Sequence, residues 1–221
     1  MVPLLWWQRS PFNNLCPTNS AGEHKRAGCV PLATAMIMAY NRTPANFSIN
    51  GHRINWDEIW KVENALIFPG SPIGEYDAAL LIRAIGLFCD TFYTSGWSFT
   101  FPQRAKDFLY DWGYTNATKH SGYDENLIIP MLQNNKPVWI AAISGVLDGH
   151  AWVIDGLMRQ RRGSQTRELL HCNWGWLGQC NGYFVSGVFK TTERVSKDTA
   201  YGDGVGEQDF NFSWWYRIIT Y

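Results

Sequence analysis

A change of sequence pattern part-way along the chain constrains its fold more than any other feature. Before residue 135, apolar residues recur at the spacing of helices. After it come short runs rich in Val, Ile, Phe, Tyr and Trp, separated by Gly, Ser, Asn and Asp. Helices first and strands afterwards predict an α+β fold with two packed halves. The 221 residues suit one domain, so we expect a helical half over 1–135 and an antiparallel sheet half over 136–221.

The expected elements can be placed by residue number. Segment 29–40 is apolar nearly all round, which predicts a buried helix, and Pro31 suits its first turn. Further helices are expected over 55–60, 76–89, 102–112 and 124–133. Strands are expected over 138–143, 150–157, 168–174, 182–189 and 214–221. The basic segment 159–163 is interpreted as a solvated hairpin tip, and the acidic, glycine-rich segment 198–209 as a surface loop.

Composition narrows the classes of protein to which this chain can belong. Aromatic residues make up 15% of it and charged residues 17%, with 19 basic and 19 acidic side chains and no net charge. This composition excludes a disordered chain and argues against a nucleic-acid partner held by basic charge. No apolar run approaches the roughly 20 residues of a membrane span, so no membrane partner is expected. The 12 tryptophans point to an aromatic surface or cleft.

The cysteines leave two structural alternatives open. There are five, an odd number, so at least one thiol lies outside any disulfide within the chain. No Cys-x-x-Cys motif occurs, and the spacing of the Cys and His residues matches no zinc signature, so we predict no metal site. The residues considered for it were Cys16, His24, His171, Cys172 and Cys180. Cys172 and Cys180 form either a disulfide or two buried thiols.

Three residues have the types and the order that acyl transfer by a thiol requires. Cys29 begins the expected buried helix, whose N-terminus lowers a thiol pKa and donates N–H groups to an oxyanion. His150 follows a glycine at the start of an expected strand. Asn173 lies in the next strand and can accept a hydrogen bond from the imidazole, while Trp174 shields that bond from water. Taken singly, each of them also has a purely structural interpretation.

Further residues complete this prediction. His150 stands 121 residues after Cys29, and Asn173 stands 23 residues after His150. This order of Cys, His and Asn matches that of papain-like proteases. Gln8 stands before the cysteine, where its side-chain amide could join the Cys29 N–H in an oxyanion hole. Asp155 precedes a glycine and suits a turn, so we expect Asn173 rather than an aspartate to orient the imidazole.

Four sequence blocks resemble the streptopain family of secreted bacterial cysteine proteases. They are Trp7-Gln8-Arg9-Ser10-Pro11-Phe12-Asn13, Gly28-Cys29-Val30 with the helix after it, Gly149-His150-Ala151-Trp152-Val153-Ile154-Asp155-Gly156, and Asn173-Trp174-Gly175-Trp176. The resemblance implies a papain-like fold, a single peptidase domain over 1–221, and cysteine endopeptidase activity that needs no cofactor. It implies Cys29 as nucleophile and His150 as general base and acid. It also implies Gln8 and Cys29 in the oxyanion hole, with Asn173 and Trp174 supporting the histidine.

The resemblance extends to substrate contacts. Segment 94–98 is similar to the segment that lines the pocket for the residue two before the scissile bond. The substrate-binding residues expected on this basis are Ser95, Gly96, Trp97, Ser98, Gly149 and Trp176. Bulky Trp97 would narrow or cap the pocket. Because the chain carries no net charge, we expect the site to select apolar side chains and backbone.

The chain also departs from the family pattern. Pro31 replaces a small residue, Met36 replaces a glutamine, Leu177 interrupts a glycine pair, and segment 201–210 replaces the family's glycine-rich loop. Family members are made with a signal peptide and a prosegment, neither of which is visible in this sequence. The chain is therefore interpreted as the mature form of a secreted or periplasmic bacterial protein. It is expected to be monomeric, with protein or peptide substrates and a prosegment or protein inhibitor as partners.

Two other functions fit parts of the pattern. A Cys-His amidase or transpeptidase acting on cell-wall peptides would use the same residues for a different reaction. A catalytically silent binding module would use the aromatic surface to hold a protein or a glycan. The reactivity of Cys29 discriminates the second of these, because an inert buried thiol is alkylated slowly near neutral pH.

Overall fold

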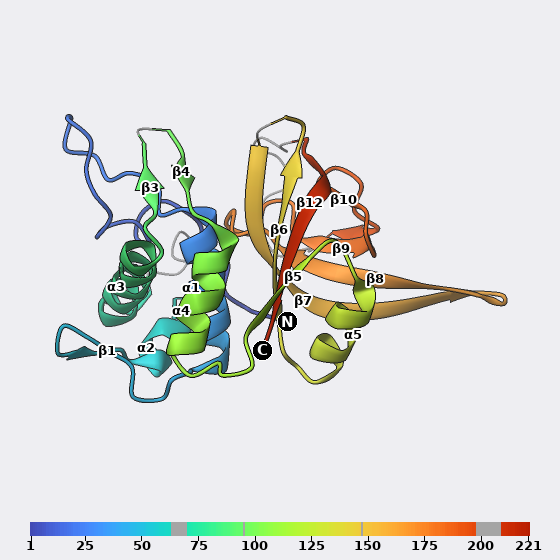
Figure 1. Cartoon of the computed structure of the whole chain (residues 1–221), viewed down its shortest axis with the longest axis horizontal. Helices are drawn as coiled ribbons and strands as arrows, with labels where there is room; N and C mark the ends of the chain where they lie inside the picture. Colours follow the sequence, from blue (N-terminus) through green and yellow to red (C-terminus); the bar gives the residue numbers. More distant parts are fainter. Residues whose placement is uncertain (63–69, 95, 147, 198–208) are drawn as a thin grey trace. The chain divides into compact units, whose positions relative to one another are not determined.

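The computed structural model describes residues 1–62, 70–94, 96–146, 148–197 and 209–221 (Figure 1). The predicted α+β class is confirmed, since helices dominate the first part of the chain and antiparallel strands the second. The chain forms two compact units. We call them the helical unit, residues 3–117 with Tyr221, and the sheet unit, residues 1–2 with 118–220.

The helical unit is built around one central helix. Its helices are α1 (Cys29–Asn41), α2 (Trp56–Trp60), α3 (Pro72–Phe88) and α4 (Pro102–Asp111). Its two short hairpins join β1 (Ser48–Ile49) to β2 (His52–Arg53), and β3 (Phe92–Tyr93) to β4 (Ser98–Phe99). Helix α1 packs against α2, α3 and α4. Neither hairpin was predicted, because two-residue strands are too short to show an alternating pattern.

The apolar character of α1 on every side explains its central position. All of its residues from Val30 to Ala39 are buried, as predicted for segment 29–40. The helix is capped by Arg42, the residue after its end, which adopts a left-handed conformation and donates its N–H to the carbonyls of the last turn. Helix α3 begins four residues before the expected position, because the Ser71 hydroxyl accepts a hydrogen bond from the Gly74 N–H and caps it there.

Among the residues that the structure describes, the sheet unit contains one helix and most of the strands. Its elements are β5 (Thr118–Ser121), α5 (Glu125–Gln133), β6 (Val138–Ser144), β7 (Asp148–Arg162), β8 (Gln165–Asn173), β9 (Gly182–Val185), β10 (Phe189–Lys190), β11 (Ser196–Lys197) and β12 (Asn211–Thr220). All pairings are antiparallel, in the order β10-β12-β6-β7-β8-β9-β11, and β5 also pairs with β12. Helix α5 packs against β6, β7 and β12, so it belongs with the sheet although its sequence pattern matches the helices before it.

The core of the sheet unit is aromatic. Trp152, Trp174, Phe184, Phe189 and Phe212 are all buried in one cluster, with ring centroids of neighbouring pairs about 5 Å apart. Rings at this separation in tilted or edge-on arrangements stabilise one another beyond the area they bury. Part of the tryptophan excess therefore fills a core rather than a cleft.

The cysteines form no disulfide in the structure. Cys172 and Cys180 are both buried, and burial raises the pKa of the Cys172 thiol well above its ordinary value. Burial likewise raises the pKa of Cys89 to about 12. Within the described residues, no three His, Cys, Asp or Glu side chains gather in a group that could hold a metal ion. No helix in the described part of the chain has the length and apolar character needed to cross a membrane.

Candidate active site

The proposed nucleophile lies at the start of α1 in the helical unit. Cys29 is the first helical residue and is partly exposed, and the carbonyl of Gly28 before it accepts the N–H of Leu32. The first turn of the helix contains no acidic residue. The positive end of the helix dipole therefore favours a thiolate at Cys29 without opposition from a carboxylate in that turn.

Gly28 is required by its backbone conformation and by a neighbour. Its φ of 94° lies in the region that glycine favours, and a Cβ at this position would lie 2.8 Å from the Ser98 Oγ. Ser98 is the first residue of β4, so the β3–β4 hairpin lies against the residue that precedes the nucleophile. The sequence prediction placed Ser98 in a substrate pocket. In the structure, Ser98 lies against Gly28, the residue before the nucleophile.

Thr94, Gly96 and Trp97 of this predicted pocket segment bond to one another at the turn of the hairpin. The Thr94 hydroxyl donates to the Trp97 carbonyl and accepts from the N–H groups of Gly96 and Trp97. The Trp97 side chain is 58% exposed, with its ring 6.1 Å from that of Phe92. Ser95, the remaining predicted residue, lies outside the described residues. Trp97 is therefore not part of the buried core of the helical unit.

The predicted oxyanion residue, Gln8, lies beside the segment that leads to the nucleophile. The carbonyl of Gln8 accepts the N–H of Ala27 at 3.0 Å, which holds Gln8 beside the residues that lead into α1. Trp6 and Trp7 anchor the same segment, since their indole N–H groups donate to the carbonyls of Val62 and Ser10. The helical unit thus places the backbone of Gln8 beside the residues that precede Cys29, and the role of its side chain in an oxyanion hole stays a prediction.

The proposed general base lies in the sheet unit within an aromatic enclosure. His150 follows the exposed Gly149 in β7, pairs with Ala142 of β6 and is only 8% exposed. Four rings surround its imidazole with centroid distances of 4.6–6.2 Å, and they belong to Trp152, Trp174, Trp176 and Phe212. Trp176 is the nearest of the four, at 4.6 Å, and is itself partly buried.

The hydrogen bond of His150 defines its tautomer. The ring Nε2 lies 2.8 Å from the main-chain carbonyl oxygen of Trp174. A carbonyl can only accept, so Nε2 carries the proton and Nδ1 is left as the basic nitrogen. Burial lowers the pKa of His150 to about 4, and the bond to Trp174 raises it by less than burial lowers it. The imidazole is therefore neutral near pH 7 and can accept a proton at Nδ1.

The partner of the imidazole differs from the prediction. We expected the Asn173 side chain to accept from His150, whereas the acceptor in the structure is the backbone carbonyl of the next residue, Trp174. The Asn173 Oδ1 accepts the Gly175 N–H at 3.2 Å. A main-chain carbonyl can take this place because the turn after β8 directs it toward β7, which residue identities alone do not show.

Asn181 is a site residue that sequence reasoning missed. Its Oδ1 accepts the Trp174 N–H at 3.0 Å, and the Trp174 indole N–H donates to the Cys180 carbonyl at 3.0 Å. Together with Asn173, these bonds hold the peptide group whose oxygen binds the His150 ring. The only signal in the sequence was the position of Asn181, a polar residue directly before the strand that begins at Gly182.

Asp155 lies within β7 rather than at a turn, which corrects the prediction for this residue. Its buried carboxylate bonds to the His171 Nδ1 and accepts the N–H of Val2 at 2.6 Å. The carboxylate is therefore occupied by His171 and the N-terminal backbone. Asp148, the other acidic residue near His150, is exposed.

An α+β chain with a cysteine at the start of a buried helix and a histidine at the start of a sheet strand has the organisation of a papain-like cysteine peptidase. Comparison with known proteins agrees with this class. Residues 6–184 match the Peptidase C10 family, and the chain belongs to that family.

Two curated relatives show how the chain compares in length. It is 25% identical over 244 residues to streptopain of Streptococcus pyogenes serotype M28 (strain MGAS6180), covering 92% of this chain and 57% of streptopain. It is 27% identical over 230 residues to the thiol protease/hemagglutinin PrtT of Porphyromonas gingivalis, covering 91% of this chain and 25% of PrtT. The chain thus spans little more than half of the first relative and a quarter of the second.

Two solved structures share the fold. Active wild-type interpain A cysteine protease of Prevotella intermedia superposes with a TM-score of 0.75 at 20% identity, covering 99% of this chain and 92% of interpain A. A prointerpain A fragment from the same organism gives a TM-score of 0.70 at 20% identity, covering 99% of this chain and 70% of the fragment. The predicted papain-like fold and streptopain-type family are therefore confirmed.

Proposed function

We propose that this chain is a cysteine endopeptidase that hydrolyses peptide bonds in proteins through Cys29 and His150. The observation that carries the proposal is the hydrogen bond from His150 Nε2 to the Trp174 carbonyl, inside an aromatic enclosure. It leaves an unprotonated Nδ1 on a buried imidazole, which is the form that a general base needs. Membership of the Peptidase C10 family supports the same reaction.

The reaction follows from these groups. His150 Nδ1 takes the Cys29 proton, and the resulting thiolate attacks the carbonyl carbon of the peptide. The negative oxygen receives hydrogen bonds from the Cys29 N–H and the Gln8 side-chain amide. The imidazolium then protonates the leaving amine, and water, deprotonated by His150, releases the acyl group from the sulfur. Because burial lowers the pKa of His150, the imidazolium formed in this reaction is stabilised by the negative charge of the thiolate.

The proposed substrates and partners follow from the surface near the nucleophile and from the relatives. Exposed Trp97 and its neighbour Phe92 suit apolar side chains of an extended peptide. One solved relative is a prointerpain A fragment, which supports a precursor form with a prosegment for this chain as well. We further propose that the protein acts as a monomer in a secreted or periplasmic bacterial location. A peptide-library cleavage profile that prefers acidic or basic residues would contradict the apolar preference.

The decisive experiment compares wild type with Cys29→Ala on casein and on a muropeptide. We expect casein cleavage by wild type, loss of that cleavage in the variant, and an unchanged circular dichroism spectrum. Cys89→Ala is the matched control, because Cys89 is a buried thiol whose removal should leave cleavage intact. Cleavage of the muropeptide alone would indicate the amidase or transpeptidase reaction. Failure to cleave either, together with slow alkylation of Cys29 by iodoacetamide, would indicate a binding module.

A further inference from the structure

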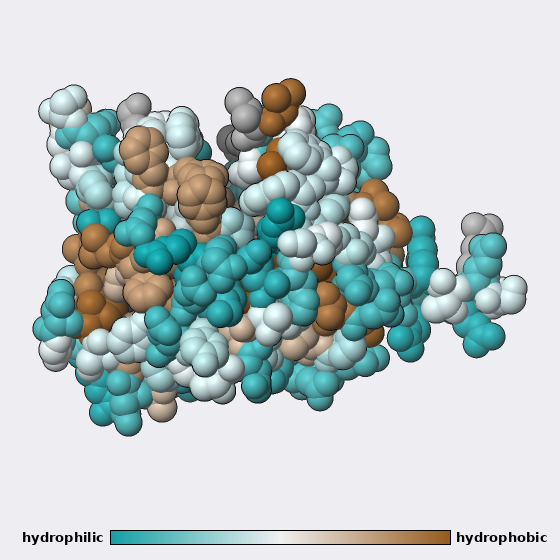
Figure 2. Space-filling view, in the orientation of Figure 1, coloured by the Kyte–Doolittle hydropathy of each residue, from teal (hydrophilic) through white to brown (hydrophobic). Residues whose placement is uncertain are grey.

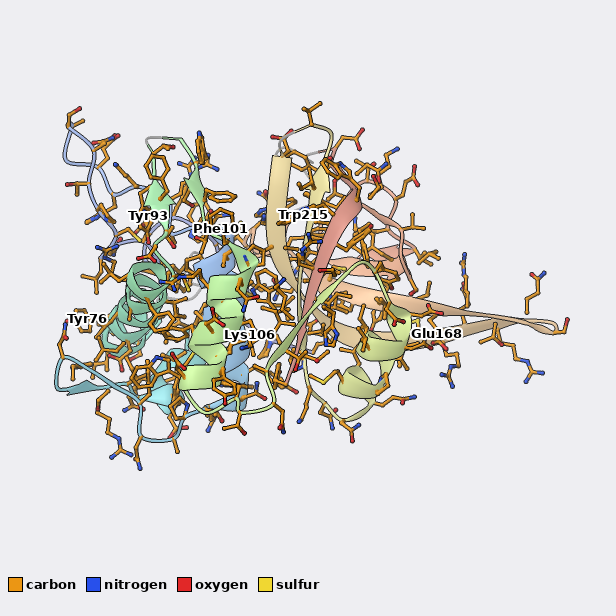
Figure 3. The ribbon with its side chains drawn as sticks, in the orientation of Figure 1. Tyr76, Tyr93, Phe101, Lys106, Glu168 and Trp215 are labelled. Atoms are coloured by element: carbon orange, nitrogen blue, oxygen red, sulfur yellow. The ribbon has the colours of Figure 1, made fainter. Side chains whose placement is uncertain are left out.

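Strands β7 and β8 continue beyond the sheet as a two-stranded ribbon for which the proposed peptidase chemistry has no use. Strand β6 pairs with β7 only as far as Ile154, and β9 pairs with β8 only from Leu169 onward. The two strands pair with each other out to Arg162 and Gln165. Figure 1 shows this hairpin extending alone past the neighbouring strands, and Figure 3 labels Glu168 where the ribbon leaves the sheet. We call residues 158–168 the basic ribbon.

Both edges of the basic ribbon lack a neighbouring strand among the described residues. On the β8 side the last recorded backbone contact is the Ser186 N–H, which donates to the Glu168 carbonyl. On the β7 side the pairing with β6 ends at Ile154. An open strand edge presents rows of N–H and C=O groups, which another extended polypeptide can pair with. Five paired residues at about 3.3 Å each give a free edge of about 17 Å.

Most of the charged side chains of the basic ribbon are positive. It contains four arginines and one glutamate, a net charge of +3, in a chain whose total net charge is zero. Arg159 and Glu168 form a cross-strand ion pair at its base, with 2.7 Å between Nε and Oε1. Figure 2 shows the ribbon as a hydrophilic projection. Its surface therefore suits an anionic partner rather than an apolar one.

Two arginines are held along the ribbon by their Nε atoms. Arg161 Nε donates to the Gly163 carbonyl at 3.1 Å, and Arg167 Nε donates to the Gln160 Oε1 at 2.6 Å. Within the described residues, these bonds use Nε and leave the two terminal nitrogens of each guanidinium to other partners. That pair of nitrogens forms the planar fork that binds a carboxylate with two parallel hydrogen bonds.

We propose that the basic ribbon is a docking site for an extended, acidic segment of another protein. The segment adds as a strand to an open edge of the ribbon. Carboxylates on one face of that strand pair with Arg161 and those on the other face with Arg167, because the register of β7 with β8 places these two arginines on opposite faces. A sulfated glycan or an anionic lipid would satisfy the arginines but has no row of amide groups for the strand edge. Arg161 stands 11 residues after His150 on β7, about 36 Å at strand spacing, so this docking is separate from the proposed catalytic step.

The test measures peptide binding to the full chain carrying Cys29→Ala, which prevents cleavage. The probe is a fluorescent 12-residue peptide of Glu-Glu-Thr repeats, which presents carboxylates on both faces of a strand, and binding is followed by fluorescence anisotropy at low salt. We expect it to bind at least tenfold more tightly than the corresponding Lys-Lys-Thr peptide. We also expect at least tenfold tighter binding than for the same Glu-Glu-Thr peptide with alternate backbone nitrogens methylated. Bound peptide should slow hydrogen exchange at backbone amides between residues 159 and 167.

Variants separate the ribbon from general charge effects. Arg161→Gln with Arg167→Gln should weaken binding at least tenfold, and Arg161→Lys with Arg167→Lys should weaken it less, because the charge remains while the fork is lost. Arg42→Gln with Arg53→Gln, two exposed arginines of the helical unit, is the matched control and should bind like the parent. Unchanged binding by the Gln variant, or equal binding of the methylated peptide, would overturn the proposal. So would binding of heparin or phosphatidylglycerol vesicles without binding of the acidic peptide.

Discussion

The two units of the molecule hold their proposed catalytic groups by different physical means. In the helical unit, Cys29 is positioned by backbone features, namely the first turn of α1 and the positive φ of Gly28 before it. In the sheet unit, His150 is positioned by packing, with four aromatic rings around it and one main-chain carbonyl at its Nε2. The nucleophile stays partly exposed, whereas the base is buried.

This difference suits the two chemical tasks. A thiol at a helix N-terminus is already biased toward its anion, so it needs access to substrate more than enclosure. An imidazole that must remain neutral until it receives a proton benefits from burial, which disfavours its charged form. The following experiments test whether backbone geometry governs one unit and aromatic burial the other.

Replacing the base should have the largest effect. His150→Gln removes Nδ1 as proton acceptor, so we expect kcat/KM on a fluorogenic peptide to fall by about 10³-fold or more. His120→Gln in the same unit is the control, because His120 bonds only to the Thr220 hydroxyl among the described residues and should retain activity. Activity of His150→Gln within tenfold of wild type would rule out His150 as the general base.

Removing one wall of the aromatic enclosure should change both stability and the titration of the base. Trp152→Ala deletes a fully buried ring beside His150, so we expect a loss of about 3–5 kcal/mol in the free energy of unfolding. Water entering the space should also raise the pKa of His150 from about 4 toward its ordinary value. Urea unfolding and NMR titration of the imidazole measure the two effects.

The control for this variant lies on the other face of the same sheet. Trp139 is fully buried on β6, and its neighbour Ile140 is the residue that pairs with Trp152, so Trp139 lies on the opposite face. Trp139→Ala should cost a similar free energy of unfolding and leave the pKa of His150 unchanged. Equal pKa changes in both variants would mean that general loosening of the sheet, not the enclosure, sets the titration.

Burial of His150 should also make stability depend on pH. The pKa is about 4 in the folded chain, below the roughly 6.5 expected when it is unfolded, so the unfolded chain binds the proton first as pH falls. The contribution is fully present above pH 6.5 and is lost between pH 6.5 and 4, by up to about 3 kcal/mol. Urea unfolding of wild type and His150→Gln from pH 4 to 8 measures it, and parallel curves for the two proteins would contradict the assignment.

The smallest effect should come from the backbone of the helical unit. Gly28→Ala places a methyl group 2.8 Å from the Ser98 Oγ, on a backbone conformation that glycine favours. We therefore expect a loss of about 1–3 kcal/mol in the free energy of unfolding, measured by urea unfolding. Gly22→Ala is the matched control, because Gly22 also has a positive φ but has no atom within 4 Å of its added Cβ among the described residues. Gly28→Ala should lose more free energy of unfolding than Gly22→Ala. The double variant Gly28→Ala with Ser98→Gly should regain this difference, because the clash with the Ser98 Oγ is removed. Equal losses at both glycines would show that the contact with Ser98 carries no energy.

The sequence by itself was sufficient for features that depend on local pattern. The apolar residues of segment 29–40 predict the buried helix α1, and the structure begins that helix at Cys29. The short runs of β-branched and aromatic residues after residue 135 predict the strands that carry His150 and Asn173. Periodicity and helix-start signals act over a few residues, so they can be recognised without knowing which distant segments meet.

Only the tertiary structure decided the contacts between segments that are distant in sequence. The acceptor for His150 is the carbonyl of Trp174 rather than the side chain of Asn173, and Asp155 pairs with His171. These choices depend on the register of β7 with β8 and on a β-bulge between Ile154 and Gly156. A one-residue shift exchanges the faces of a strand, so residue types cannot specify such partners until the pairing is formed.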